Sequence, residues 1–167
     1  MNIVVFGCDN TGKSTLCSDL VKIFNANGYI CDTTHSPGPK PIEELVEFIE
    51  NNLLSKDSKE IRIFDRFPII EEAVYGKLLR GGSRFNDEEY NKQTLGRIDA
   101  FIYCFPERES ILNWGAREQM DGVKENAEDI IDEYTNVFNK IIKINNKVII
   151  YDYNKNTAFG VFDWLVK

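Results

Sequence analysis

The segment GCDNTGKST, residues 7–15, contains residue types at a spacing that can bind phosphate. It fits the pattern G-x-x-x-x-G-K-S/T, whose glycines let backbone N–H groups surround phosphate oxygens. In this pattern Lys13 reaches the β- and γ-phosphates, and the Ser14 hydroxyl ligates Mg²⁺. The segment therefore predicts a site for ATP and Mg²⁺, although GTP fits the same residues. The residues predicted to bind the nucleotide are Gly7, Asn10, Thr11, Gly12, Lys13, Ser14 and Thr15.

The same match has a simpler interpretation, in which a turn before a helix binds nothing and Lys13 is a solvated surface charge. The position of the segment favours the phosphate loop. The apolar run NIVVF precedes it and a helical pattern follows it, which is the context that the motif requires.

Asp65 and Arg66 form a second pair of reactive residue types, at the end of the apolar run IRIF. Such a run followed by Asp is typical of a Walker B element, but an ATPase would commonly continue with Glu. The GTPase signatures, N-K-x-D and a D-x-x-G switch after the loop, are missing, so a small-molecule kinase remains. Asp65 would then hold Mg²⁺ or orient an acceptor oxygen, and Arg66 would bind a phosphate. The alternative is a structural ion pair between them.

Asp9 lies inside the predicted phosphate loop, where a carboxylate is electrostatically unfavourable unless its side chain points away from the phosphates. It could instead face the molecule that receives the phosphoryl group. The alternative is that Asp9 only hydrogen-bonds to backbone in a tight turn, as Asp often does.

Short apolar segments alternate with longer amphipathic ones along the chain, which predicts an α/β fold. We expect about five parallel strands with helices on both faces, and ligands at the carboxyl edge of the sheet. Strands are predicted at residues 2–7, 29–35, 60–68, 99–105 and 146–153. Helices are predicted at residues 13–27, 41–54, 69–79, 107–113 and 128–142, after residues 80–90, and at the C-terminus.

Composition limits the classes of function. The chain, residues 1–167, has the length of a single domain and a net charge of −7, which disfavours general binding to nucleic acid. No apolar run reaches the roughly 20 residues that span a bilayer. The four cysteines lack the spacing of a zinc site, and no signal peptide precedes the first strand. We therefore expect free thiols and a cytoplasmic location.

Three segments together resemble the thymidylate kinase family: GCDNTGKST with its internal acid, DRF at 65–67, and SPGP at 36–39. The resemblance implies a P-loop kinase fold, often dimeric, so a homodimer is expected as one option. It also implies that Asp9 bonds the sugar hydroxyl of the acceptor and that Arg66 contacts its phosphate. A lid would lie at about residues 114–126, where Arg117, its only arginine, would stabilise the transferring phosphoryl group.

The acceptor side departs from that family in several places. His35-Ser36 replaces the usual Arg-Glu, and the lone histidine is interpreted as a turn residue. The usual serine and Ala-Tyr-Gln pattern after DRF is not reproduced in register. Phe67 and Tyr75 could form the walls of a base pocket, or belong to the core, and Arg80 could reach a phosphate.

The leading hypothesis is ATP- and Mg²⁺-dependent phosphoryl transfer to a deoxynucleoside monophosphate, with a thymidylate-like pyrimidine favoured. One alternative acceptor is an unphosphorylated nucleoside, or a modified base hydroxyl in DNA, with Asp65 as base or orienter. Another alternative is a nucleotide-binding regulator without turnover. The predicted catalytic residues are Asp9, Lys13, Asp65, Arg66 and Arg117.

Overall fold

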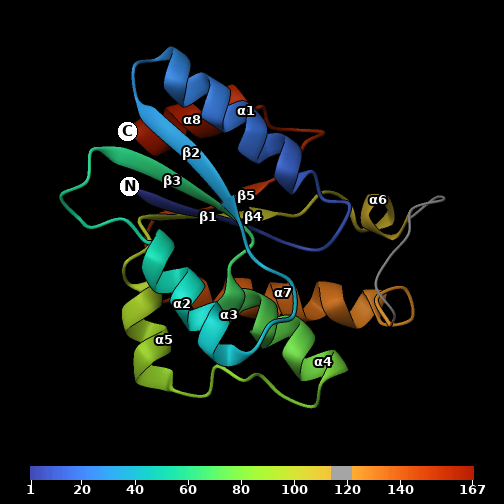
Figure 1. Ribbon diagram of the computed structural model, residues 1–167. Helices are drawn as coiled ribbons and strands as arrows, with labels where there is room; N and C mark the ends of the chain where they lie inside the picture. The colour runs from blue at the N-terminus through green and yellow to red at the C-terminus, as the bar shows by residue number, and fades with distance from the viewer. Residues whose placement is uncertain (114–121) are drawn as a thin grey trace.

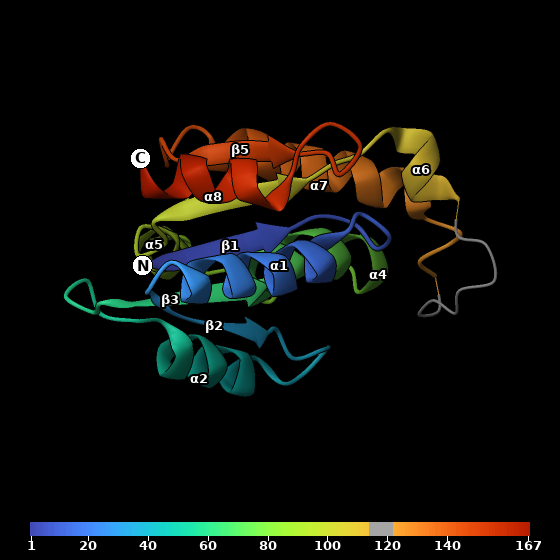
Figure 2. The same ribbon diagram turned by 90° about the horizontal axis from the view of Figure 1, so that it is seen from above.

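A parallel β-sheet forms the centre of the molecule (Figure 1). The computed structural model describes residues 1–113 and 122–167, and within them the sheet has five strands in the order β2-β3-β1-β4-β5. Figure 2 shows the strands side by side in this order, and each neighbouring pair is parallel. The predicted α/β fold is confirmed. The strands are β1 (Asn2–Phe6), β2 (Ile30–His35), β3 (Glu60–Asp65), β4 (Ala100–Cys104) and β5 (Val148–Tyr151).

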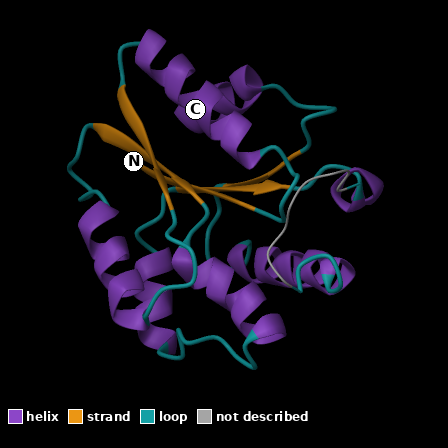
Figure 3. Cartoon of the chain, turned by 45° about the vertical axis from the view of Figure 1, so that its right-hand side comes forward, coloured by secondary structure: helices purple, strands orange, loops and turns teal. Residues whose placement is uncertain are grey.

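Helices cover both faces of the sheet (Figure 3). Helices α1 and α8 lie on one face, and α2, α3, α5 and α7 lie on the other (Figure 1). None of the described helices is long and apolar enough to cross a membrane. The helices are α1 (Lys13–Ala26), α2 (Ile42–Asn52), α3 (Pro68–Glu71), the π-helical segment η1 (Glu72–Gly76), α4 (Lys77–Leu79), α5 (Glu88–Leu95), α6 (Arg108–Leu112), α7 (Ala127–Ile141) and α8 (Ala158–Val166).

Strand β1 is buried on both faces, which explains its continuous apolar sequence. Its side chains alternate between two cores. Ile3 and Val5 pack in the core that α1 and α8 cover, and Val4 and Phe6 pack in the core of the opposite layer. Because β1 lies at the centre of the sheet, the loop that follows it begins at the middle of the carboxyl edge.

The helix predicted at residues 69–79 forms, but it is not a regular α-helix. Its middle, η1, is π-helical and joins α3 to α4. A π-helical turn holds one more residue than an α-helical turn, and such turns are frequent at functional sites. Glu72 and Tyr75, both in η1, are buried and line a cavity at the carboxyl edge of the sheet.

Candidate active site

The phosphate loop connects β1 to α1 and depends on two glycines. Gly7 has φ 140°, and a Cβ atom there would lie 2.4 Å from the carbonyl oxygen of Cys104. Gly12 has φ 80° and lies directly before α1. Both positions therefore require glycine. The Thr11 hydroxyl closes the turn by donating to the carbonyl oxygen of Cys8 at 2.8 Å. The first turn of α1 follows this loop directly, and the free N–H groups at the start of a helix favour a bound anion.

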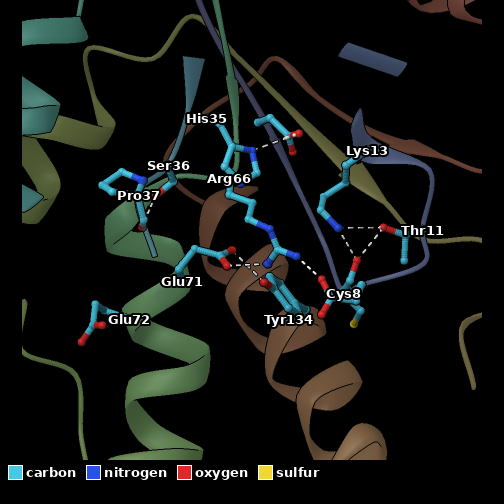
Figure 4. A network of polar contacts seen from close by, with 12 residues as sticks. Cys8, Thr11, Lys13, His35, Ser36, Pro37, Arg66, Glu71, Glu72 and Tyr134 are labelled. Carbon is cyan, nitrogen blue, oxygen red and sulfur yellow. Dashed lines mark hydrogen bonds and ion pairs between the residues drawn. The ribbon is translucent and has the colours of Figure 1, made fainter. Parts of the chain in front are cut away.

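Lys13 is buried in this loop, with 5% of its surface exposed, so the interpretation of Lys13 as a solvated surface charge is wrong. Its ammonium group donates to the carbonyl oxygen of Cys8 and lies 3.4 Å from the Thr11 hydroxyl (Figure 4). Burial, and then the positive charge of Arg66, lower the pKa of Lys13. A buried cation with these few polar partners would be stabilised by a bound phosphate.

Ser14 and Asp65 meet at the start of α1, because β1 and β3 are neighbours in the sheet. The Ser14 hydroxyl donates to Asp65 Oδ2 at 2.6 Å, and the other carboxylate oxygen, Oδ1, is buried without a hydrogen-bond partner in the described residues. No group of three or more His, Cys, Asp or Glu that could hold a metal is found in residues 1–113 and 122–167. Mg²⁺ in kinases needs only one or two carboxylates, with waters and substrate phosphates as its other ligands. The pair therefore fits Mg²⁺.

His35 is a residue that the sequence analysis missed. It is not in a turn but is the last residue of β2, directly opposite Asp65 in the register of β2 and β3. Its Nδ1 atom lies 3.3 Å from Asp65 Oδ2. The position of His35 at a strand end was visible in the sequence, but the pairing of β2 with β3 was not.

Arg66 connects the phosphate loop to α3 through two carboxylates. Its Nη2 atom donates to Asp9 Oδ1, and its Nη1 atom donates to Glu71 Oε2 at 2.7 Å. Tyr134 of α7 donates to the other oxygen of Glu71 at 2.7 Å (Figure 4). Arg66 also has φ 71°, a strained conformation for a residue other than glycine, and such strain is concentrated at functional sites.

These contacts exclude one alternative that the sequence left open, an ion pair between Asp65 and Arg66. Asp65 bonds to Ser14 and His35, and Arg66 bonds to Asp9 and Glu71, so Asp65 and Arg66 are not an ion pair with each other. The Asp9 side chain accepts a hydrogen bond from the Arg66 guanidinium, so it is not limited to bonds with backbone in its own turn.

A cavity of about 870 Å³ opens beside the loop. Asp9 belongs both to the phosphate loop and to the cavity wall, so the two features are contiguous. Tyr75 lines the cavity, and its hydroxyl is buried without a hydrogen-bond partner among the described residues. The lining residues are Asp9, His35, Ser36, Pro37, Gly38, Pro39, Leu45, Arg66, Pro68, Glu71, Glu72, Tyr75, Leu79 and Arg80.

Phe67 does not line this cavity, so its prediction as a pocket wall is wrong. The side chain is fully buried in the core, where its ring packs edge-on against Phe64 at 5.2 Å. The chain turns sharply at Arg66, and the next side chain consequently points into the core while Arg66 points to the loop.

Arg117 lies outside the described residues, as do residues 114–121 of the predicted lid. The element before them is tied to the phosphate loop: the Asn10 side chain donates to the carbonyl oxygens of Ser110 at 2.9 Å and of Asn113 at 3.2 Å. The chain therefore leaves α6 next to the phosphate loop.

No protein-family model and no curated protein matches the chain by sequence, whereas solved structures share its fold. The YorR protein of Bacillus subtilis, solved in complex with phosphorylated GDP, is similar with a TM-score of 0.64 and 15% identity. The match covers 99% of this chain and 94% of YorR.

Two kinases are also similar. Polyphosphate kinase 2 of Arthrobacter aurescens TC1 has a TM-score of 0.64 and 14% identity, and the match covers 99% of this chain but 65% of that protein. Deoxyadenosine kinase of M. mycoides, solved with the products dCMP and a flexible dCDP, has a TM-score of 0.53 and 16% identity. The match covers 99% of this chain and 96% of that protein. At these identities the similarity concerns the fold, and it confirms a P-loop kinase fold without singling out the thymidylate kinases.

Proposed function

We propose that this protein is a kinase that transfers the γ-phosphoryl group of ATP to a deoxynucleoside monophosphate, with a thymidylate-like pyrimidine favoured. The observation that carries the proposal is the shared wall between the phosphate loop and the cavity of about 870 Å³, formed by Asp9. Small-molecule sites are commonly about 300 to 1,000 Å³ in volume. A nucleotide in this cavity would lie beside the donor phosphates.

On the donor side, the loop N–H groups and Lys13 would bind the β- and γ-phosphates, and Ser14 and Asp65 would hold Mg²⁺. The chemistry that Mg²⁺ supplies when bound is neutralisation of charge on the phosphate oxygens. Lys13 would release the carbonyl oxygen of Cys8 to reach a phosphate. Arg117 of the predicted lid is proposed to stabilise charge on the transferring group.

On the acceptor side, Asp9 would bond the sugar hydroxyl, Tyr75 would contact the base, and Arg66 and Arg80 would supply positive charge. No covalent step by the protein is needed. Catalysis would consist of holding the acceptor in line with the γ-phosphate and stabilising charge there.

The similar structures support this class of reaction. YorR was solved with phosphorylated GDP, and the deoxyadenosine kinase was solved with dCMP and dCDP, so two proteins of this fold bind nucleotides. These ligands belong to those proteins, and their bases differ from each other. The favoured pyrimidine therefore rests on the resemblance of the sequence to thymidylate kinases.

A second candidate acceptor is an unphosphorylated nucleoside, or a modified base hydroxyl in DNA. The network around Arg66 favours it, because both terminal nitrogens of the guanidinium are already bound by the carboxylates of Asp9 and Glu71. The charge of Arg66 is therefore already balanced by two carboxylates, which weakens its attraction for an acceptor phosphate, whereas a neutral hydroxyl needs no such cation. Asp65 would then orient the attacking hydroxyl.

A panel of acceptors tests these proposals. ADP release from ATP, and GDP release from GTP, would be measured with each nucleoside monophosphate, each nucleoside and an oligonucleotide carrying hydroxylated bases. We expect one preferred monophosphate and a diphosphate product. A monophosphate or phosphorylated DNA as product would favour the second candidate. Tight ATP binding without ADP release for any acceptor would contradict both and favour a regulator.

A further inference from the structure

Glu72 lines the cavity and accepts hydrogen bonds from two arginines. The residue is 3% exposed, and both of its carboxylate oxygens accept hydrogen bonds. Oε1 accepts from Nη2 of Arg80 and from Nη2 of Arg84, the latter at 2.8 Å, and Oε2 accepts from Nε of Arg84 at 3.0 Å. Figure 4 shows Glu72 apart from the network around Arg66. The cavity thus has two separate charged groups in its wall.

The local backbone is built to bring these groups together. The carbonyl oxygen of Gly76, the last residue of η1, accepts from the N–H groups of Arg80 at 3.1 Å and Gly82 at 2.9 Å. A Cβ atom on Gly76 would lie 2.9 Å from the carbonyl oxygen of Gly82 and 3.1 Å from Glu72 Oε2. Only glycine allows the turn at residues 80–84 to fold back onto η1, so the Glu72 contacts depend on Gly76.

Arg84 extends the cluster to another part of the cavity wall. Its Nη1 atom donates to the carbonyl oxygen of Lys40 at 2.7 Å. Lys40 follows the segment SPGP, residues 36–39, each of which lines the cavity. Glu72 is therefore connected through one arginine to a loop that has no helix or strand of its own between β2 and α2.

The two arginines that line the cavity, Arg66 and Arg80, differ in how far carboxylates balance their charge. Burial alone would raise the pKa of Glu72, but the hydrogen bonds and charges of Arg84 and Arg80 lower it, so Glu72 is ionised. The single negative charge of Glu72 balances only one of the two guanidinium charges, so this cluster keeps a net charge of about +1. The Arg80 guanidinium has no hydrogen-bond partner besides Glu72 in the described residues, whereas each Nη atom of Arg66 donates to a different carboxylate.

We propose that Glu72 is a positioning residue that fixes Arg80 in the cavity wall and, through Arg84, holds the loop at residues 36–41 in place. Arg80 offers only donors, so it would bind an electronegative group on the part of the acceptor that does not react. Because Glu72 fixes the guanidinium in advance, the acceptor does not bear the cost of ordering it. This proposal rests on the proposed kinase function.

Steady-state kinetics of Glu72→Gln test the proposal, with Glu50→Gln as the matched control. Glu50 forms a similar pair with Arg97 at 2.7 Å, but on the surface and outside the cavity. For Glu72→Gln we expect KM for the acceptor to rise at least tenfold, with kcat within about threefold and KM for ATP unchanged, as for loss of binding common to ground and transition states. Glu50→Gln should match the wild type. A folded Glu72→Gln protein with unchanged KM for the acceptor would overturn the proposal.

NMR of Arg84→Met tests the structural half without any substrate. This change removes the link to Lys40 but leaves the bond between Glu72 and Arg80. We expect the amide signals of Gly38 and Lys40 to shift or broaden, and Glu50→Gln to leave them unchanged; unchanged signals in Arg84→Met would overturn the link. If Glu72→Gln does not fold, the same variant still tests the part of the proposal that concerns the loop at residues 36–41. If the wild type phosphorylates no acceptor, the proposed function fails, and these signals alone decide whether Glu72 and Arg84 hold the loop.

Discussion

At the scale of single residues, burial of the Lys13 charge predicts a lower stability of the free protein. The ammonium group of Lys13 is buried, and its pKa is lowered mainly by burial. We expect Lys13→Met to reduce kcat by at least about 10²-fold, because a charge that stabilises the transferring phosphate is lost. The ligand-free variant should nevertheless be more stable than the wild type, since the cost of burying a charge disappears. Activity assays and urea unfolding would measure both effects, with the exposed Lys22→Met as the control.

The pH dependence of this stability difference has a defined sign. A lowered pKa means that the folded protein disfavours protonated Lys13, so the wild type carries the full cost at pH values below that lowered pKa. The cost decreases as the pH rises through the lowered pKa towards the ordinary lysine value of about 10.4. Urea unfolding should therefore show the advantage of Lys13→Met shrinking in alkaline solution. An advantage that grows with pH would contradict the assignment.

Asp65 is predicted to account for the dependence of activity on Mg²⁺. In Asp65→Asn the side chain keeps its size, and its amide oxygen can still accept from the Ser14 hydroxyl, but the negative charge is lost. We expect the Mg²⁺ concentration for half-maximal activity to rise by a factor on the order of 10 to 100, by analogy with other changes around bound metals. The exposed Asp32→Asn of the neighbouring strand is the control. Equal Mg²⁺ dependence in both variants would exclude Asp65 as a ligand.

At the scale of elements, the π-helical segment η1 shapes the cavity wall. A π-helical turn holds more residues than an α-helical turn, which changes the side chains that face the same side of the helix, and Glu72 and Tyr75 of η1 both line the cavity. The periodicity of the sequence predicted a helix here, but it could not reveal the π-helical turn.

Gly76 is the position where this element should tolerate change least. In Gly76→Ala the new Cβ atom would lie 2.9 Å from the carbonyl oxygen of Gly82, so the turn must shift. We expect the free energy of unfolding to fall by about 1 to 3 kcal/mol, as for overpacking in other proteins. Gly160→Ala is a suitable control, because its nearest neighbour atom is 3.5 Å away and alanine favours the helix. Urea unfolding that ranks the two variants equally would contradict the close packing.

Strand ends show what the sequence could and could not predict at this scale. Apolar runs and glycine positions indicated the strands, the loop and the carboxyl edge where Asp65 lies, because these patterns are local. The order of the strands depends on contacts between distant segments. For this reason the neighbours of Asp65, which are Ser14 and His35, and the pairing of Arg66 with Asp9 and Glu71 emerged only from the structure.

For the whole molecule, the four cysteines predict a loss of stability in alkaline solution. All four are free and buried. Burial raises the pKa of Cys8, Cys31 and Cys104 from about 9.0 to about 12 and raises that of Cys17 as well. Because unfolded thiols release their protons first, stability that is present below pH about 9 should be lost as the pH rises towards 12.

Urea unfolding in reducing buffer between about pH 8 and about pH 11 measures this loss. Each fully buried thiol contributes at most about 1.4 kcal/mol per pH unit above its unfolded pKa. Cys104→Ala should show a shallower decline than the wild type. A flat profile for the wild type would mean that the thiols titrate normally and are not buried as described.

The fold and the donor loop were predictable from the sequence because a single chemical pattern specifies each of them. The cavity beside the loop was predictable only in part: Tyr75 and Arg80 line it, whereas Phe67 does not, and Glu71, Glu72 and His35 were not foreseen. These residues come from β2, α3 and η1, which meet only in the folded molecule. A homodimer stays a prediction.

The central claim is that the donor loop and the cavity form one active site. Transfer of label from γ-labelled ATP, followed by separation of the products, tests it most directly. We predict Mg²⁺-dependent appearance of the label on the preferred acceptor with the wild type, and none with Lys13→Met. Label found only as inorganic phosphate, for every acceptor tried, would contradict the claim.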